Sequence, residues 1–256
     1  MKEGLVLLFI LFLLLASGGM SSAADQEELT VSAAISLKNA FGEAGRLYEA
    51  KHKGARVLFN FGASGNLARQ IEAGAPVDVF ASAARMDMDT IERGGFIVPG
   101  SRKNFAGNSI VLIVPVNSQL PVTSFDDLVS EKIQRIAVGN FKTVPAGRYA
   151  EEVFHHFHLL PAVREKLIFG ENVRQVLDYV SRGEVDAGIV YSTDARIRPK
   201  EVRVVTSAPK GSHRTIVYPI AVVKGTKNET PSRSFISFIL SPEGQKILDR
   251  YGFNIP

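Results

Sequence analysis

The chain has 256 residues, of which 45% are hydrophobic and 22% charged, and its formal net charge is +4. These proportions are typical of a globular protein and exclude a disordered or fibrous one. Basic residues are spread along the sequence without a long block of like charge, which argues against nucleic-acid binding. The sequence contains no cysteine, which excludes disulfides, thiolate metal sites and a cysteine nucleophile.

Residues 1–24 have the layout of a secretory signal peptide. Lys2 precedes an apolar run over residues 5–16, and small residues end the segment at Ser22 and Ala24. The run is too short for a comfortable membrane span. We expect cleavage before Asp25, a soluble periplasmic or otherwise extracytoplasmic product, and no lipid anchor, because lipid attachment there needs a cysteine. An uncleaved N-terminal anchor is the alternative, since Glu3 offsets Lys2.

The remaining sequence alternates predicted strands and helices. The first run comprises strand 29–34, helix 37–51, strand 56–61, helix 66–73, strand 78–81 and helix 86–93. The second run comprises strand 109–115, helix 125–130, strand 135–138, helices 146–157 and 173–182, strands 186–191, 202–206 and 215–223, and helices 232–240 and 243–251. This alternation predicts an α/β protein with sheets flanked by helices.

Two successive α/β units without a long linker predict two lobes. We expect residues 25–106 and 219–256 to form lobe 1 and residues 107–218 to form lobe 2, with strands 110–114 and 216–223 crossing between them. Ligand sites in such sheets lie at the carboxyl ends of the strands, where helices begin. A cleft between two lobes is also a favoured place for a ligand.

Five strand-to-helix turns carry groups that donate hydrogen bonds. These groups are the hydroxyls of Ser36, Ser64 and Tyr191 and the backbone N–H groups of Ala146 and Val173. The first N–H groups of a helix lack an intrahelical partner and carry partial positive charge, so converging helix starts predict an anion site. The turn around Ser36, taken alone, is more simply explained as an ordinary helix cap.

The turn around Ser64 is rich in small residues, with Gly62 and Gly65 on either side. These glycines allow a ligand to approach the backbone closely. The sequence lacks the order of a P-loop and the spacing of a nucleophile elbow. A pocket of neutral donors suits a fully deprotonated dianion such as molybdate, tungstate or sulfate, whereas hydrogen phosphate needs an acceptor for its proton.

Segments of the chain resemble, in order, those of the bacterial molybdate-binding protein family. The segments are AAISL at 33–37, FGASGNLARQIEAGAP at 61–76, VDVFASA at 77–83, VPAGRYA at 144–150, ENVR at 171–174, GIVY at 188–191 and SPEGQKILDRYGF at 241–253. Together they extend the resemblance over nearly all of residues 29–256. Ile35 and Lys38 depart from the residues expected in relatives, which leaves the effect of Lys38 on selectivity open.

The resemblance implies a two-lobe type II periplasmic binding-protein fold with the ligand cleft between the lobes. It implies that molybdate or tungstate binds without direct metal ligands, held by Ser36, Ser64, Ala146, Val173 and Tyr191. It also implies a monomeric solute-binding protein that delivers the oxyanion to the membrane permease of an ABC importer. Neither an enzymatic activity nor a cofactor is expected.

Three alternatives remain open at this stage. Sulfate or a small organic anion is the first. Sulfate differs from molybdate in size, which the sequence does not reveal, and Arg148 and Arg174 near the turns would favour an organic carboxylate, although we expect both side chains to point away. A serine hydrolase is the second, but no histidine lies in these turns to act as the base. A metal site at His155 and His158 is the third; zinc would need a further ligand there, so a solvated histidine patch is the simpler interpretation.

Overall fold

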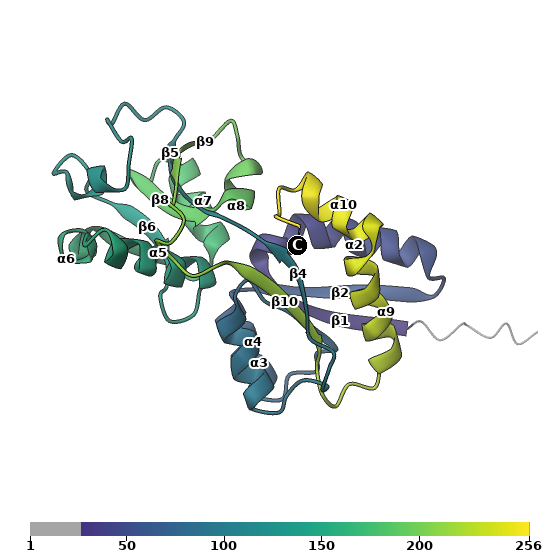
Figure 1. The fold of residues 1–256 in the computed structure, drawn as a ribbon. Helices are drawn as coiled ribbons and strands as arrows, with labels where there is room; N and C mark the ends of the chain where they lie inside the picture. Colours follow the sequence, from purple (N-terminus) through teal and green to yellow (C-terminus); the bar gives the residue numbers. More distant parts are fainter. Residues whose placement is uncertain (1–26, 256) are drawn as a thin grey trace, which may run out of the picture.

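The computed structural model describes residues 27–255, so the predicted signal peptide lies outside the described residues. Two five-stranded sheets lie side by side, each flanked by helices (Figure 1). This architecture confirms the α/β two-lobe fold expected from the sequence. Within the described residues, no helix is both long and apolar enough to cross a membrane.

The first sheet has the strand order β2-β1-β3-β10-β4. Strands β1 and β2 are parallel, as are β1 and β3, whereas β10 runs antiparallel to both β3 and β4. The bounds of its strands are β1 Glu27–Ala34, β2 Ala55–Gly62, β3 Val79–Ala81, β4 Lys103–Gly107 and β10 Val217–Val222.

The second sheet has the strand order β7-β6-β8-β5-β9. Its bounds are β5 Ile110–Pro115, β6 Ile136–Gly139, β7 Leu167–Gly170, β8 Ala187–Tyr191 and β9 Val202–Ser207. Strand β6 is parallel to β7 and β8, whereas β5 is antiparallel to β8 and β9. Both sheets therefore share one topology: the parallel strands stand in the order second, first, third, and two antiparallel pairings complete the sheet.

The helices and 3-10 turns lie in the connections between strands, except α9 and α10, which follow the last strand, β10. Their bounds are η1 Ile35–Leu37, α2 Lys38–Lys51, α3 Ser64–Glu72, α4 Arg85–Arg93, η2 Asp126–Val129, α5 Pro145–His156, α6 Leu160–Val163, η3 Arg164–Lys166, α7 Val173–Ser181, α8 Ser192–Arg196, α9 Glu229–Leu240 and α10 Pro242–Arg250. Helices α3 and α4 lie together on one side of the first sheet, and α2, α9 and α10 lie on the other (Figure 1).

Alternation along the strands explains how the first sheet is covered on both faces. Phe80 of β3 packs in a cluster with Met88 and Ile91 of α4, whereas its neighbours Val79 and Ala81 belong to the larger core. Successive side chains of a strand point to opposite faces, so an unbroken apolar run serves two helical layers.

The crossings between the sheets differ from the expected ones. Strand β5 lies wholly in the second sheet and β10 in the first, so the chain crosses in the segments just before them, at residues 108–109 and 208–216. The prediction that strands 110–114 and 216–223 themselves cross was therefore wrong. Long apolar strands mark burial in a sheet, and short polar connectors such as Asn108 and Ser109 carry no such pattern.

Candidate functional site

A small cavity lies where the carboxyl ends of strands from both sheets face one another. Its lining comprises Ala34, Ile35, Ser36, Gly62, Ala63, Ser64, Ala83, Val144, Pro145, Ala146, Val173 and Tyr191. All five residues singled out from the sequence are in this set, and they come from segments up to 155 residues apart, the separation of positions 36 and 191. The structure therefore brings the predicted turns together at one place.

The described residues that line the cavity have no charged side chain. Lys38 and Glu171, two charged residues close in sequence to the predicted turns, are exposed and do not line it. An anion in this cavity would therefore be held by neutral hydrogen-bond donors and by the partial positive charge at helix N-termini, without a charged side chain as its counter-ion.

Ser64 is the first residue of α3 and is fully buried. The backbone N–H of Ala83 donates a 3.0 Å hydrogen bond to Ser64 Oγ. Because that oxygen accepts from an N–H, the hydroxyl hydrogen of Ser64 remains available to donate toward the cavity. The sequence predicted a helix start further along, at residue 66, and the structure instead makes Ser64 part of the helix.

Ser36 lies in the 3-10 turn η1 between β1 and α2 and is 6% exposed. Its Oγ is 3.1 Å from the hydroxyl oxygen of Tyr218, a residue of β10 that is completely buried. Tyr218 thus contacts the candidate site from the strand that follows the second crossing between the sheets.

Helix α5 presents its first turn to the cavity through Pro145 and Ala146. Pro145 has no N–H, and the helical pattern begins with a 3.1 Å bond from the Arg148 N–H to the Val144 carbonyl. The N–H groups of Ala146 and Gly147 come before Arg148 in the chain, so they have no carbonyl acceptor within the helix. Gly147 is a packing requirement, because a Cβ there would lie 2.0 Å from the Gly139 carbonyl oxygen.

Helix α7 begins at Val173. The side chain of Asn172 accepts 3.0 Å hydrogen bonds from the N–H groups of Arg174 and Gln175. This cap satisfies the two N–H groups that follow Val173 and leaves the Val173 N–H as the one at the cavity. Asn172 is thus the N-cap of α7.

Tyr191 ends β8 and is 1% exposed. Its hydroxyl donates a 3.1 Å hydrogen bond to the carbonyl of Ala83, which belongs to the other lobe. Burial raises the pKa of Tyr191 well above its ordinary value, so the phenol stays neutral. A hydroxyl has one hydrogen, so Tyr191 can donate either to Ala83 or to a guest in the cavity.

Three further contacts join the lobes around the cavity. The Gly65 N–H donates a 3.1 Å bond to the Thr143 carbonyl. Arg148 of α5 forms a buried ion pair with Asp87 of α4. On the other flank, the guanidinium of Arg174 donates to Asn39 Oδ1 at 3.3 Å. These contacts close the seam between the lobes.

Arg148 and Arg174 do not line the cavity, in agreement with the expectation that both side chains point away. Arg174 also lies 3.4 Å from a carboxylate oxygen of Asp194, which is fully buried. Both Asp194 oxygens lack a hydrogen-bond partner among the described residues. Burial, opposed by the Arg174 charge, raises the pKa of Asp194 to about 6.

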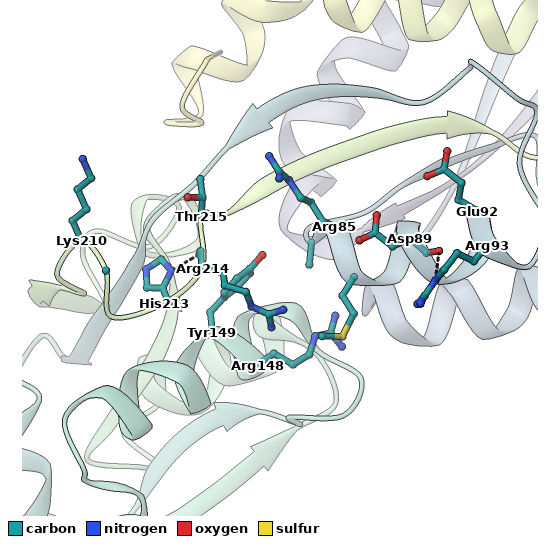
Figure 2. A pocket seen from close by; sticks show the side chains of 13 residues that line it. Arg85, Asp89, Glu92, Arg93, Arg148, Tyr149, Lys210, His213, Arg214 and Thr215 are labelled. Atoms are coloured by element: carbon teal, nitrogen blue, oxygen red, sulfur yellow. Dashed lines mark hydrogen bonds between the residues drawn. The ribbon is translucent and has the colours of Figure 1, made fainter.

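A wider groove of about 930 Å³ lies beside Arg148, between α4 and α5. Figure 2 shows Arg148 and Tyr149 on one side, Arg85, Asp89, Glu92 and Arg93 on the other, and Lys210, His213, Arg214 and Thr215 from the segment before β10. Asp89 and Glu92 form ion pairs with Arg102. The groove is therefore lined by charged side chains, in contrast with the neutral cavity.

The structure adds two residues to the site: Ala83, which lines the cavity, and Tyr218, which contacts the Ser36 hydroxyl from behind it. Ala83 lies after β3 in a segment quoted for the family resemblance, and Tyr218 stands in an apolar strand where it has the pattern of a core residue. Neither position carries a local signal of a polar role. Across residues 27–255, no group of three or more His, Cys, Asp or Glu side chains is placed to hold a metal ion.

Comparisons with known proteins agree with this architecture. The family model for bacterial extracellular solute-binding proteins matches residues 29–254. The molybdate-binding protein ModA of Haemophilus influenzae is 38% identical over 247 residues, covering 94% of this chain and 95% of its own. A protein of Bacillus subtilis, YvgL, assigned as an ABC transporter substrate-binding lipoprotein, is 40% identical over 246 residues, covering 94% of each chain.

Solved structures show the same fold. The substrate-binding domain assigned to a molybdenum ABC transporter of Clostridium difficile superposes with a TM-score of 0.69 at 36% identity, covering 90% of this chain and 99% of its own. The sulfate-binding protein SubI of Mycobacterium tuberculosis superposes with a TM-score of 0.77 at 19% identity, covering 90% and 87%, a likeness of fold alone. The chain belongs to the family of bacterial extracellular solute-binding proteins.

Proposed function

We propose that the protein binds molybdate in the cavity between its lobes as the solute-binding component of an ABC importer. The observation that carries this proposal is the meeting of five donor groups from both lobes in a cavity with no charged lining residue. The names of relatives at 38% identity, which are molybdate-binding proteins, support molybdate among the possible dianions. Tungstate has the same charge and shape, and we propose it as a second ligand.

The site residues act as donors only. Ser36 and Ser64 supply hydroxyl hydrogens, and Ala146 and Val173 supply backbone N–H groups. Tyr191 has to turn its hydrogen from the Ala83 carbonyl to the anion, so its contribution includes breaking the 3.1 Å bond seen here. Burying a dianion without partners is prohibitively costly, which explains why the donors are many and fixed in advance.

Binding would stabilise the closed arrangement of the lobes. We propose residues 25–106 and 219–256 as lobe 1, which provides Ser36 and Ser64, and residues 107–218 as lobe 2, which provides the other three groups. An anion that contacts both lobes binds the closed form better than an open one and shifts the population toward it. The closed form is the state that a membrane permease would recognise.

The proposed setting is extracytoplasmic, after removal of residues 1–24 as a signal peptide. The relative YvgL is named a lipoprotein. This sequence contains no cysteine to which a lipid could be attached, so we propose that the protein is not lipidated. We propose a monomer with the solute and the permease as its partners, without a cofactor and without enzymatic activity.

Isothermal titration of the purified protein with molybdate, tungstate, sulfate and phosphate tests this function. We expect tight one-to-one binding of molybdate and tungstate, weaker binding of the smaller sulfate, and the weakest binding of phosphate, whose proton finds no good acceptor. Tight binding of sulfate alone would overturn the ligand, and binding of none of the four would overturn the function.

A further inference from the structure

A chain of buried side-chain hydrogen bonds leads from the crossings between the sheets to the cavity. Asn108 Nδ2 donates to Thr193 Oγ1 at 2.9 Å and to the Tyr218 hydroxyl oxygen at 3.1 Å, and that oxygen lies 3.1 Å from Ser36 Oγ. All four residues are buried, with exposed fractions of 7% or less. Asn108 belongs to one crossing and Tyr218 follows the other.

The orientation of the Asn108 amide is fixed by its other contacts. Its Oδ1 accepts from the Ser109 backbone N–H at 2.9 Å and from Ser192 Oγ at 3.0 Å. A backbone N–H can only donate, so the amide oxygen faces Ser109 and the NH₂ group faces Tyr218. The Tyr218 oxygen therefore receives a hydrogen from Asn108.

The Tyr218 hydroxyl hydrogen then points to Ser36. Among the described residues Ser36 Oγ and Asn108 Nδ2 are the hydrogen-bond partners of this hydroxyl, and Asn108 Nδ2 cannot accept. If Ser36 donated instead, the phenolic hydrogen would be buried without a partner, which is costly. Burial also raises the pKa of Tyr218 well above its ordinary value, so the hydrogen is retained near neutral pH.

Both serines of the cavity therefore have the same hydrogen-bond arrangement. Ser64 Oγ accepts from the Ala83 N–H and Ser36 Oγ accepts from Tyr218. Each hydroxyl has its own hydrogen left for the cavity, which both residues line. A serine hydroxyl has one hydrogen and two lone pairs, and in each of these two serines the group behind it occupies one lone pair. The hydrogen is therefore not used behind the cavity and is directed toward it.

We propose that Tyr218 is a positioning residue that commits Ser36 to donate and thereby selects fully deprotonated oxyanions over protonated ones. This inference rests on the proposed function of the cavity. Hydrogen phosphate has to donate one hydrogen, and Ser36 is a poor acceptor for it, because its oxygen already accepts from Tyr218 and its own hydrogen is directed at the ligand. Without the phenolic hydroxyl, Ser36 can rotate and accept, so discrimination against phosphate falls.

Titration of Tyr218→Phe with molybdate and with inorganic phosphate tests the proposal. We expect the Kd for molybdate to rise about tenfold and the ratio of phosphate Kd to molybdate Kd to fall by more than that. Tyr149→Phe is the matched control: Tyr149 is buried, its ring centre is 6.4 Å from that of Tyr191, and it lines the groove instead of the cavity. This control should leave both constants unchanged.

A double variant separates positioning from packing. In a Ser36→Ala background, Tyr218→Phe should no longer change the ratio of the two constants, because no hydroxyl remains to be oriented. The proposal would be overturned by an unchanged ratio in the single variant, or by an equal change of the ratio with and without Ser36. In either case molybdate binding by the wild type would still support the proposed function. Absence of oxyanion binding by the wild type would overturn both.

Discussion

The N–H of Gly65, in the first turn of α3, donates a 3.1 Å hydrogen bond to the carbonyl of Thr143, in the turn before α5. This bond joins the two lobes directly beside Ser64 and Ala146. A Cβ at Gly65 would lie 2.7 Å from that carbonyl oxygen and 3.0 Å from Thr143 Cα. Glycine at this position therefore permits the backbones of the lobes to meet.

Gly65→Ala should weaken molybdate binding about tenfold or more, because the methyl group keeps the lobes from closing fully. The melting temperature should stay the same or rise slightly, since alanine favours a helix. Titration and thermal unfolding check both parts. The control is Gly42→Ala in α2, where the nearest atom to an added Cβ is Arg46 Nη1 at 3.9 Å. Equal affinities in the two variants would contradict this role for Gly65.

The sequence predicted the turns of the site better than the contacts between them. Helix starts have local signals, such as Pro145 and the Asn172 cap, and these placed Ala146 and Val173 correctly at the cavity. The Tyr218 contact with Ser36 joins residues 182 positions apart, and nothing local distinguishes Tyr218 from a core tyrosine. The shared strand order of the two sheets was equally hidden, because it rests on topology without a repeat in the sequence.

The secondary structure, too, could be predicted only in part from the sequence. Apolar strands and long helices were located, whereas β4, β7 and the short helices α6 and α8 were missed. Strand β7 has two exposed residues, Ile168 and Phe169, and lies at the edge of its sheet. Edge strands and one-turn helices gain their structure from neighbours, so their own sequence carries a weak pattern.

The Asp87–Arg148 pair is buried on both sides, at 6% and 8% exposure, and spans the lobes. Asp87→Asn leaves the Arg148 charge buried without a counter-charge in the closed form. Losing one partner of such a pair costs about 3–5 kcal/mol, so molybdate binding should weaken by about one hundredfold to a few thousandfold. Titration of a neutral double variant, Asp87→Leu with Arg148→Met, should recover most of the affinity. A double variant as weak as the single one would argue against an electrostatic role.

Asp194 should make stability depend on pH. Its pKa is raised from 3.8 to about 6 in the folded state, so folding favours its protonated form. The unfolding free energy is therefore reduced as the pH rises through this window, by about 3 kcal/mol in total. Urea unfolding of wild type and Asp194→Asn at pH 4 and pH 7 should show the advantage of the variant growing by most of that amount. A difference that is the same at both pH values would contradict the burial argument.

Ser64→Ala should raise the Kd for molybdate by a factor corresponding to about 1–3 kcal/mol. The variant loses one donor to the anion and leaves the Ala83 N–H without its acceptor. Ser207→Ala, at the exposed end of β9, is the control and should bind like the wild type. An affinity unchanged by Ser64→Ala would remove Ser64 from the site.

The proposed function requires a single oxyanion held between the lobes by groups from both. A crystal structure with molybdate bound, measured at the molybdenum absorption edge, would locate that oxyanion. We expect one anomalous peak in the cavity, with oxyanion oxygens about 3 Å from Ser36 Oγ, Ser64 Oγ and the N–H groups of Ala146 and Val173. A peak in the groove beside Arg85, or contacts from one lobe alone, would contradict it.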